Sequence, residues 1–216
     1  MKTLLSDLRT AVFLTLLLVV ACCIAYPVAV WAAGQALFPE KAGGSLVADQ
    51  SGAVRGSTLL AQSFASDKYF QPRPSAAGTG YDSTSSSGTN YGPTSAKLAN
   101  GSHAKDAQGK DVNDPNNFDG IKDLVAAYRA SNSLQASDPV PADAVTRSAS
   151  GLDPQISVAN ALLQAARVAK ARHAPVESVN ALVPSSTQDR DLGVFGEPGV
   201  NVLELNLALD REFPSR

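Results

Sequence analysis

The chain has 216 residues, with 18 Lys and Arg against 20 Asp and Glu, and a formal net charge of −2. This near-neutral balance excludes an electrostatic nucleic-acid binder and a polybasic membrane-surface protein, because phosphate recognition needs a clustered excess of cations. Both Cys lie in the most apolar stretch of the chain, which leaves only the two His for a structural zinc site that usually takes four ligands. The length fits one domain with an attached segment.

Residues 11–33 predict a transmembrane helix. No charged residue interrupts this stretch of 23 residues. A helix of that length is about 34 Å long, which exceeds the ~30 Å hydrocarbon core of a bilayer. A cleavable signal peptide has a shorter apolar core, and an acylated Cys22 would require a polar sequence directly after it, so we expect an uncleaved anchor. Pro27 should kink this helix unless the carbonyl that it frees finds another partner.

The flanking charges predict the orientation of this span. Lys2 and Arg9 precede it, whereas only Lys41, next to Glu40, follows within a dozen residues. Cations accumulate on the cytoplasmic side of a span. We therefore expect a single-pass protein of a bacterial inner membrane, with residues 1–10 in the cytoplasm and residues 34–216 forming an extracytoplasmic domain.

Small residues recur every four positions along the span, at Ala21, Ala25, Ala29 and Ala33. In lipid, helices associate through close approach of their backbones at small side chains rather than through the hydrophobic effect. We expect this stripe to contact a helix of a partner protein.

The first part of the soluble region combines a hairpin with a long loop. Residues 45–64 predict two strands around a turn at residues 50–52. Residues 75–110 are rich in Ser, Gly and Thr, a composition that favours a flexible surface loop. The interleaved Tyr81 and Tyr91 count against pure disorder.

Helical periodicity follows this loop. Residues 119–134 predict an amphipathic helix, with apolar side chains three and four positions apart. Residues 176–183 predict a short helix. Residues 203–209 alternate Leu with other residues, the period-two pattern of a half-buried strand. The fold class is therefore mixed α+β (α/β), behind one transmembrane helix.

Residues 145–173 contain the most clearly bounded helix. Asp153 can cap its N-terminus with Pro154 in the first turn, or Ser157 can cap it one turn later. The expected buried stripe comprises Leu162, Leu163, Ala166 and Ala169.

The sequence carries none of the motifs of common enzymes. GxxxxGK[ST], GxGxxG, HExxH, CxxC and GxSxG are absent. The Asp/Asn-rich stretch 110–120 does not match a calcium-binding loop in any frame. No carboxylate pattern surrounds His103 or His173 in the sequence, which favours surface residues. We expect no catalytic residue, no metal site and no intrinsic cofactor.

Three regions carry more distinctive motifs. They are YFQPRPSA at 69–76 with SGTNYGPT at 87–94, VTRSASGLDP at 145–154, and GEPGVNVLELNLALD at 196–210. Together with one N-terminal span, they closely resemble the C subunit of the Kdp-type potassium-transporting ATPase, a bacterial P-type pump. The resemblance covers nearly the whole chain in the right order. The departures from the family's usual pattern are Ser87, Tyr91, Gln155, Val158 and Gly199.

The resemblance implies a non-catalytic subunit of a high-affinity potassium uptake pump, in which the complex handles ATP and potassium. Its implied partners are a channel-like potassium-conducting subunit, an ATP-hydrolysing P-type subunit and a further small membrane subunit. The family is described as a catalytic chaperone that raises the ATP affinity of the hydrolysing subunit. An extracytoplasmic domain meets no ATP, so we favour docking at the outer mouth of the potassium-conducting subunit.

The resemblance also implies candidate contact residues and an ordered loop, because the punctuation of TNYGPT suits fixed turns. The candidates are Arg73, Asn90, Gly92, Pro93, Thr94, Ser148, Ser150, Gly151, Asp153, Glu197 and Asn201. A membrane-anchored periplasmic ligand-binding or sensor module stays open as an alternative.

Overall fold

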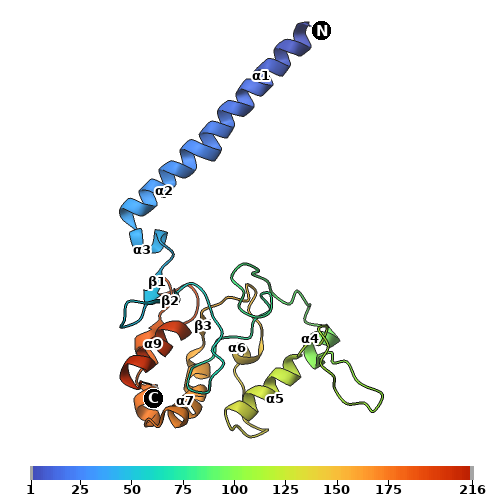
Figure 1. Ribbon diagram of the computed structural model, residues 1–216, viewed down its shortest axis with the longest axis vertical. Coiled ribbons are helices and arrows are strands. Elements are labelled where there is room, and N and C mark those ends of the chain that lie inside the picture. The colour runs from blue at the N-terminus through green and yellow to red at the C-terminus, as the bar shows by residue number, and fades with distance from the viewer. Residues whose placement is uncertain (1, 215–216) are drawn as a thin grey trace. The chain divides into compact units, whose positions relative to one another are not determined.

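The structure is a computed structural model that describes residues 2–214 and divides the chain into two compact units, Met1–Leu46 and Val47–Arg216 (Figure 1). In the first unit, α1 (Lys2–Val19), a π-helical turn η1 (Val20–Ala25) and α2 (Tyr26–Leu37) follow one another, and the short helix α3 (Pro39–Ala42) comes next. Residues 3–37 are long and apolar enough to cross a membrane, as judged by length and composition. The predicted span lies within this helix.

The π-helical turn lies directly before Pro27. Proline has no backbone N–H to donate to the preceding turn. The N–H of Tyr26 reaches the carbonyl of Ala21, five residues back, instead of the usual four. The ribbon continues through this region without a break (Figure 1). The hydrogen-bond ladder thus adjusts to the proline by widening one turn.

The boundary between the units falls within β1 (Leu46–Ala48), which forms a two-stranded sheet with β2 (Val54–Ser57) and confirms the predicted hairpin. A long segment of turns leads to α4 (Ala96–Asn100), α5 (Ile121–Ser131) and α6 (Ala142–Val145). The predicted helices at 119–134 and 176–183 correspond to α5 and α8.

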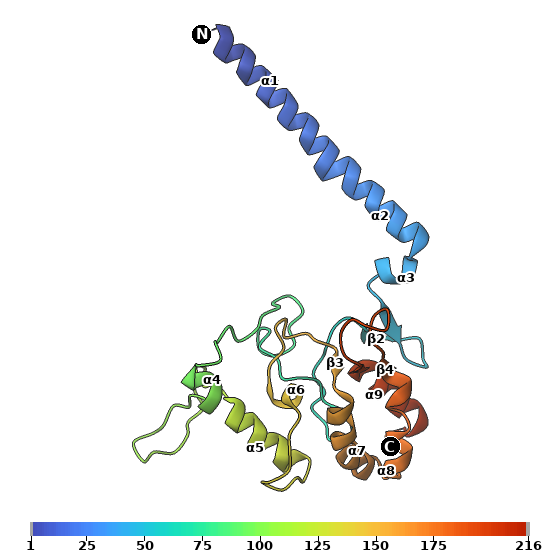
Figure 2. The same ribbon diagram turned by 180° about the vertical axis from the view of Figure 1, so that it is seen from behind.

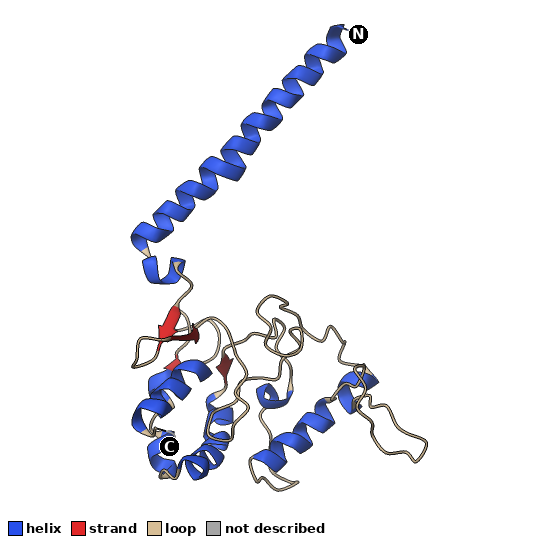
Figure 3. Cartoon of the chain, in the orientation of Figure 1, coloured by secondary structure: helices blue, strands red, loops and turns tan. Residues whose placement is uncertain are grey.

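The second half of this unit contains most of the core. Its elements are β3 (Gln155–Ile156), α7 (Val158–Arg172), α8 (Val176–Asn180), the 3₁₀ turn η2 (Pro184–Ser186), β4 (Thr187–Gln188), β5 (Gly199–Asn201) and α9 (Val202–Glu212). β5 is the central strand of an antiparallel sheet of order β3-β5-β4. In this sheet Ile156 and Thr187 both lie opposite Val200. The strands are short, and helices and loops make up most of the domain (Figure 3).

The hydrophobic core lies where α7, α8, α9 and β5 meet. α7 and α9 lie together, whereas α4 and α5 lie to the other side of the unit (Figures 1 and 2). The buried core residues are Phe70, Ile156, Ala161, Ala165, Val168, Ala169, Val179, Val183, Val200, Val202, Leu205 and Leu209. The mixture of helices with small antiparallel sheets confirms the predicted fold class.

α7 is capped by Ser157, whose hydroxyl accepts a hydrogen bond from the N–H of Asn160 (3.1 Å). This decides between the two predicted caps, since Asp153 lies outside the helix. At the other end, His173 adopts the left-handed conformation (φ 55°) that often terminates helices.

The predicted buried stripe of α7 is mostly wrong. Leu162 is 45% exposed, Leu163 is intermediate and Ala166 is exposed, whereas Ala169 is buried as expected. The helix instead buries the face that carries Asn160, Ala161, Gln164, Ala165, Arg167, Val168 and Ala169. Three of these side chains are polar, and their partners within the fold make their burial possible.

The predicted strand at 203–209 is also wrong, because these residues belong to α9. Asn201 caps this helix by accepting a hydrogen bond from the N–H of Glu204 (3.2 Å). The residues buried most deeply are Val202, Leu205, Asn206 and Leu209. Their spacing of three and four positions is that of a helix face.

Candidate functional site

Two of the motifs meet in what we call the motif junction, formed by residues 73–77, 86–88 and 146–153. Arg73 Nη1 donates to Asp153 Oδ2 at 2.9 Å, and Arg73 Nη2 donates to the carbonyl of Thr146 at 3.3 Å. The two charged side chains are only 26% and 31% exposed. The ion pair therefore fixes two segments that lie 80 positions apart in the sequence.

Serine and glycine residues complete the motif junction. Ser75 Oγ donates to the carbonyl of Gly151 (2.7 Å), and the N–H of Ser87 donates to the carbonyl of Ser150 (3.0 Å). Ser148 is buried and 3% exposed. Gly151 has φ 68°, and a Cβ there would lie 2.6 Å from the carbonyl oxygen of Ser87. Glycine is thus required at this position by both conformation and space.

Tyr81 anchors the start of the Ser/Gly/Thr-rich loop to the same junction. Its hydroxyl donates to the carbonyl of Arg73 at 2.8 Å. Burial raises the pKa of Tyr81 to about 12, so the phenol remains a neutral donor at physiological pH. The loop is therefore attached to the domain at its beginning.

The TNYGPT motif lies elsewhere, on the surface. Asn90, Gly92, Pro93 and Thr94 are exposed, and Asn90 adopts a left-handed conformation (φ 55°). The neighbouring Tyr91 packs edge-on against Phe118, with 5.3 Å between ring centroids. Lys97 and Arg147 lie over the Phe118 ring, at 5.6 Å and 4.5 Å from its centroid. These ring and cation contacts attach the middle of the loop near α4 and α5.

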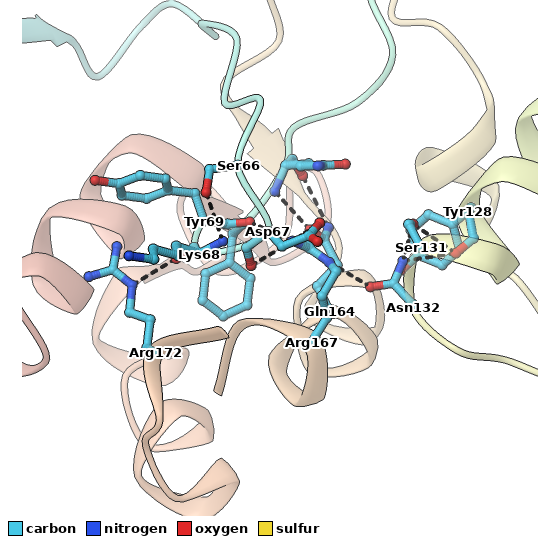
Figure 4. A network of polar contacts seen from close by, with 12 residues as sticks. Ser66, Asp67, Lys68, Tyr69, Tyr128, Ser131, Asn132, Gln164, Arg167 and Arg172 are labelled. Atoms are coloured by element: carbon cyan, nitrogen blue, oxygen red, sulfur yellow. Dashed lines mark hydrogen bonds and ion pairs between the residues drawn. The ribbon is translucent and has the colours of Figure 1, made fainter. Parts of the chain in front are cut away.

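A buried arginine forms the centre of a polar network, which we call the Arg167 cluster (Figure 4). Arg167 Nη1 donates to the carbonyls of Asp67 (2.9 Å) and Tyr69 (3.1 Å). Its Nε donates to Asn132 Oδ1 (3.1 Å), and its Nη2 donates to Gln164 Oε1 (2.9 Å). Its side chain is 6% exposed, and burial lowers its pKa below the usual value. One side chain thus connects α5, α7 and the 66–70 segment.

Arg172, one turn further along α7, holds the same segment from the other side (Figure 4). It donates to the carbonyls of Lys68 (2.7 Å) and Phe213 (2.7 Å) and pairs with Asp210 (2.7 Å). Its guanidinium also lies 4.6 Å from the centroid of the Tyr69 ring. This contact network joins the 66–70 segment to α7 and to the end of α9.

Two side-chain amides extend this attachment by pairing with the main chain. Asn206 accepts from the N–H of Phe70 and donates to its carbonyl, both at 2.9 Å. Gln164 pairs in the same way with Gln71, at 2.7 Å and 3.0 Å. The segment is therefore held much as a strand is held in a sheet, with side-chain amides in place of a neighbouring strand.

The fold places two carboxylates beside His103, although no carboxylate pattern surrounds it in the sequence. His103 Nε2 lies 3.2 Å from Asp123 Oδ2 and 3.7 Å from Asp119 Oδ1. The three groups could together ligate a cation, since their ligand atoms lie within 4.8 Å of one another. Asp123 Oδ2 also accepts from the N–H of Gly120 (2.8 Å), at the start of α5. That bond, followed by the one with His103, lowers the pKa of Asp123.

A cavity of about 1090 Å³ lies between the β1–β2 hairpin and α9. Its lining combines apolar residues, such as Phe64 and Leu203, with charged ones, such as Arg55 and Asp210. Hydrogen bonds from Ser51 and then from Arg55 hold the pKa of Asp49, on the same wall, well below its usual range.

The last motif divides between surface and core. Glu197 lies in the exposed loop between β4 and β5, where it pairs with Arg190 (2.5 Å). Asn201 is fully buried, and its Nδ2 donates to the carbonyl of Thr58 (2.9 Å) in addition to capping α9. In the first unit, Ala21, Ala25, Ala29 and Ala33 are all exposed along the helix.

The fold thus gathers Arg73, Ser148, Ser150, Gly151 and Asp153 at one junction, but not the other predicted residues. It also presents three exposed apolar side chains that the sequence analysis missed, Leu192, Val194 and Phe195. The sequence feature that could have revealed them is the apolar stretch LGVFG at 192–196, which lies within a charged segment.

These features define a class of protein: a small α+β domain behind a helix of membrane-spanning length, whose motif residues make internal contacts. The family model for KdpC, the c chain of the K⁺-transporting ATPase, matches residues 8–211. The chain therefore belongs to the KdpC family.

The sequences of curated relatives align with this chain over almost their entire lengths. The potassium-transporting ATPase KdpC subunit of Rhodospirillum rubrum is 46% identical over 210 residues, covering 97% of this chain and 98% of the relative. That of Mycobacterium bovis BCG is 48% identical over 200 residues (92% and 95%). That of Caulobacter sp. K31 is 44% identical over 214 residues (98% and 96%).

Proposed function

We propose that this chain is a non-catalytic accessory subunit that supports assembly and function of the pump. Its partners would be the channel-like potassium-conducting subunit, the ATP-hydrolysing subunit and a further small membrane subunit. The domain would dock at the extracytoplasmic mouth of the potassium-conducting subunit. Family membership favours this role over the periplasmic sensor module considered from the sequence.

The observation that carries this proposal is how the motif residues are used. Arg73, Gly151 and Asp153 are engaged with groups of the chain itself, and so are the buried Arg167 and Arg172. Residues held in this way maintain the shape of the domain. The motifs therefore support a rigid docking module rather than a reaction centre.

The extracytoplasmic location rests on the cations at Lys2 and Arg9, before the span. Ser85 is exposed in the Ser/Gly/Thr-rich loop, so a Ser85→Cys chain should react with a membrane-impermeant maleimide in intact spheroplasts. The parent chain, whose Cys22 and Cys23 lie in the span, serves as the control. Labelling that occurs only after lysis would place the domain in the cytoplasm.

The catalytic-chaperone role described for the family would, in this proposal, act through assembly and not through ATP held by this subunit. The purified full-length subunit should therefore give no saturable heat signal with ATP in calorimetric titration. Binding tighter than about 10 µM, which is roughly −7 kcal/mol, would support direct nucleotide handling instead. Loss of pump ATPase activity without this subunit is expected under both alternatives and does not distinguish them.

A further inference from the structure

The loop between β4 and β5, residues 189–198, carries a cluster of exposed apolar side chains. Leu192, Val194 and Phe195 are 90%, 67% and 64% exposed. Single exposed apolar residues are ordinary, but several large ones at one loop tip are typical of an interaction site. We call these three side chains the apolar tip.

Hydrogen bonds hold the loop in one conformation. The N–H groups of Asp191 and Phe195 each donate to the other's carbonyl at 2.9 Å, and the N–H of Gly193 donates to the carbonyl of Arg190 at 3.0 Å. The Arg190–Glu197 ion pair closes the base of the loop at 2.5 Å. The apolar tip is thus preformed, which reduces the entropy lost on binding.

The backbone at the tip is also unusual. Leu192 has φ 53° and Gly193 has φ 77°. A left-handed conformation is uncommon for a leucine and costs free energy in the unbound protein. This conformation turns a large side chain outward, where it is 90% exposed. Such strain at an exposed apolar residue is consistent with a contact that forms only in a complex.

The charges around the tip identify the type of partner. The loop contains three acidic residues, Asp189, Asp191 and Glu197, and one cationic residue, Arg190. An anionic lipid surface would repel this excess of carboxylates, and the loop has no Lys, Trp or Tyr to anchor it at a membrane interface. A protein pocket with apolar walls and a cationic rim matches both the side chains and the charge.

We propose that the apolar tip inserts into an apolar pocket, rimmed by cationic side chains, on another subunit of the pump. This inference rests on the proposed docking function and identifies the surface that docks. β5 continues from the loop into the centre of the three-stranded sheet, so the tip is rigidly connected to the core.

The test is recovery of the tagged subunit with the detergent-solubilised pump. Leu192→Ser with Phe195→Ser should lower this recovery at least tenfold. The thermal unfolding midpoint of the subunit should not change, because both side chains are exposed. The matched control is Val112→Ser with Leu162→Ser, two apolar residues that are 37% and 45% exposed elsewhere on the domain. This control should be recovered like the parent chain.

The charge of the loop provides a second test. Asp189→Asn with Asp191→Asn should weaken recovery and reduce its dependence on salt, because a cationic rim loses its complement. Full recovery of the Leu192/Phe195 variant would overturn the proposal while leaving the docking function intact. Failure to recover the parent chain itself would instead overturn the docking function.

A lipid partner is distinguished by a fluorescent probe. A Phe195→Cys chain in a Cys22→Ala, Cys23→Ala background is labelled with an environment-sensitive dye and reconstituted into phosphatidylethanolamine–phosphatidylglycerol vesicles. The dye should report an apolar environment only when the other pump subunits are present. An apolar signal from the subunit alone would overturn the proposal in favour of the bilayer.

Discussion

At the scale of single residues, polar side chains perform packing roles that apolar residues perform in most small domains. Arg167, Gln164 and Asn206 are nearly inaccessible to water, and each is hydrogen-bonded to the main chain of the 67–71 segment. A buried polar group without a partner is strongly destabilising. The segment, which has no strand or helix of its own in the described chain, is therefore held in place by these specific partners.

We expect Arg167→Met to destabilise the domain by about 3–5 kcal/mol, because it removes the donor to two carbonyls and to Asn132 Oδ1, and one of the two donors to Gln164 Oε1. Lys170→Met, on the exposed side of the same helix, should change stability by no more than about 0.5 kcal/mol. Urea unfolding of the full-length subunit in detergent, followed by near-UV circular dichroism, measures both. Equal midpoints for the two variants would show that the cluster contributes nothing.

At the scale of elements, local sequence patterns predicted the hairpin at 45–64, from its turn residues, and α5, from apolar residues three and four positions apart. Both were found. α9 was predicted as a strand because Leu203, Leu205, Leu207 and Leu209 alternate, whereas one position of its true buried face is Asn206. The spacing of apolar residues alone was used to predict helices and strands. A buried amide therefore interrupts the helical pattern, and the period-two pattern of the leucines remains.

The prediction of the candidate site from the sequence was also incomplete. The motif residues were identified, but their pairing, for example Arg73 with Asp153, depends on the fold and not on their spacing. The same is true of His103 with Asp119 and Asp123. No single-sequence pattern could have placed these groups together.

The cap of α9 provides a test at this scale. Asn201→Ala removes both the bond from Glu204 and the donor to the carbonyl of Thr58, so we expect a loss of about 2–3 kcal/mol. Ser95→Ala, which removes the cap of the five-residue helix α4, is the control and should cost under about 1 kcal/mol. Thermal unfolding followed by circular dichroism would distinguish them, and a larger loss for Ser95→Ala would contradict the assigned role of Asn201.

The start of α5 gives a prediction for pH. The pKa of Asp123 lies below its ordinary value because the folded state binds the carboxylate through Gly120 and then His103. This stabilisation is complete at neutral pH and is lost as the pH falls from the ordinary value of 3.8 through the lower folded pKa. Asp123→Asn should therefore destabilise the domain at pH 7 and flatten the decline in acid. Asp119→Asn retains the Gly120 contact and should keep the parental profile, as measured by unfolding at a series of pH values.

At the scale of the whole molecule, the π-helical turn affects which residues share one side of the span. Four residues exceed one α-helical turn by about 40°, so small residues spaced by four drift around a regular α-helix. Ala21 and Ala25 lie in the wider π-helical turn, where four residues fall short of a full turn. This offsets the drift from Ala25 to Ala29 and Ala33 and keeps the stripe on one side.

If this stripe packs against a partner helix, Ala25→Leu with Ala29→Leu should lower recovery of the tagged subunit with the detergent-solubilised pump several-fold, because bulky side chains separate the backbones. Leu17→Ala with Leu18→Ala, which removes more apolar surface, is the control and should have the smaller effect. Equal recovery of the two variants would mean that the domain alone holds the complex.

The two hydrogen bonds between the Asn206 side chain and the main chain of Phe70 limit how early the domain can fold during synthesis. The two residues are 136 positions apart, a distance that a ribosome covers in roughly 7–27 s. The central strand β5 is completed only at Asn201, so β3 also lacks its neighbour until then. The nascent chain consequently lacks these native contacts until residue 206 has been synthesised. A chain that stops before residue 199 lacks β5 and Asn206, and we expect it to stay unfolded and to be degraded.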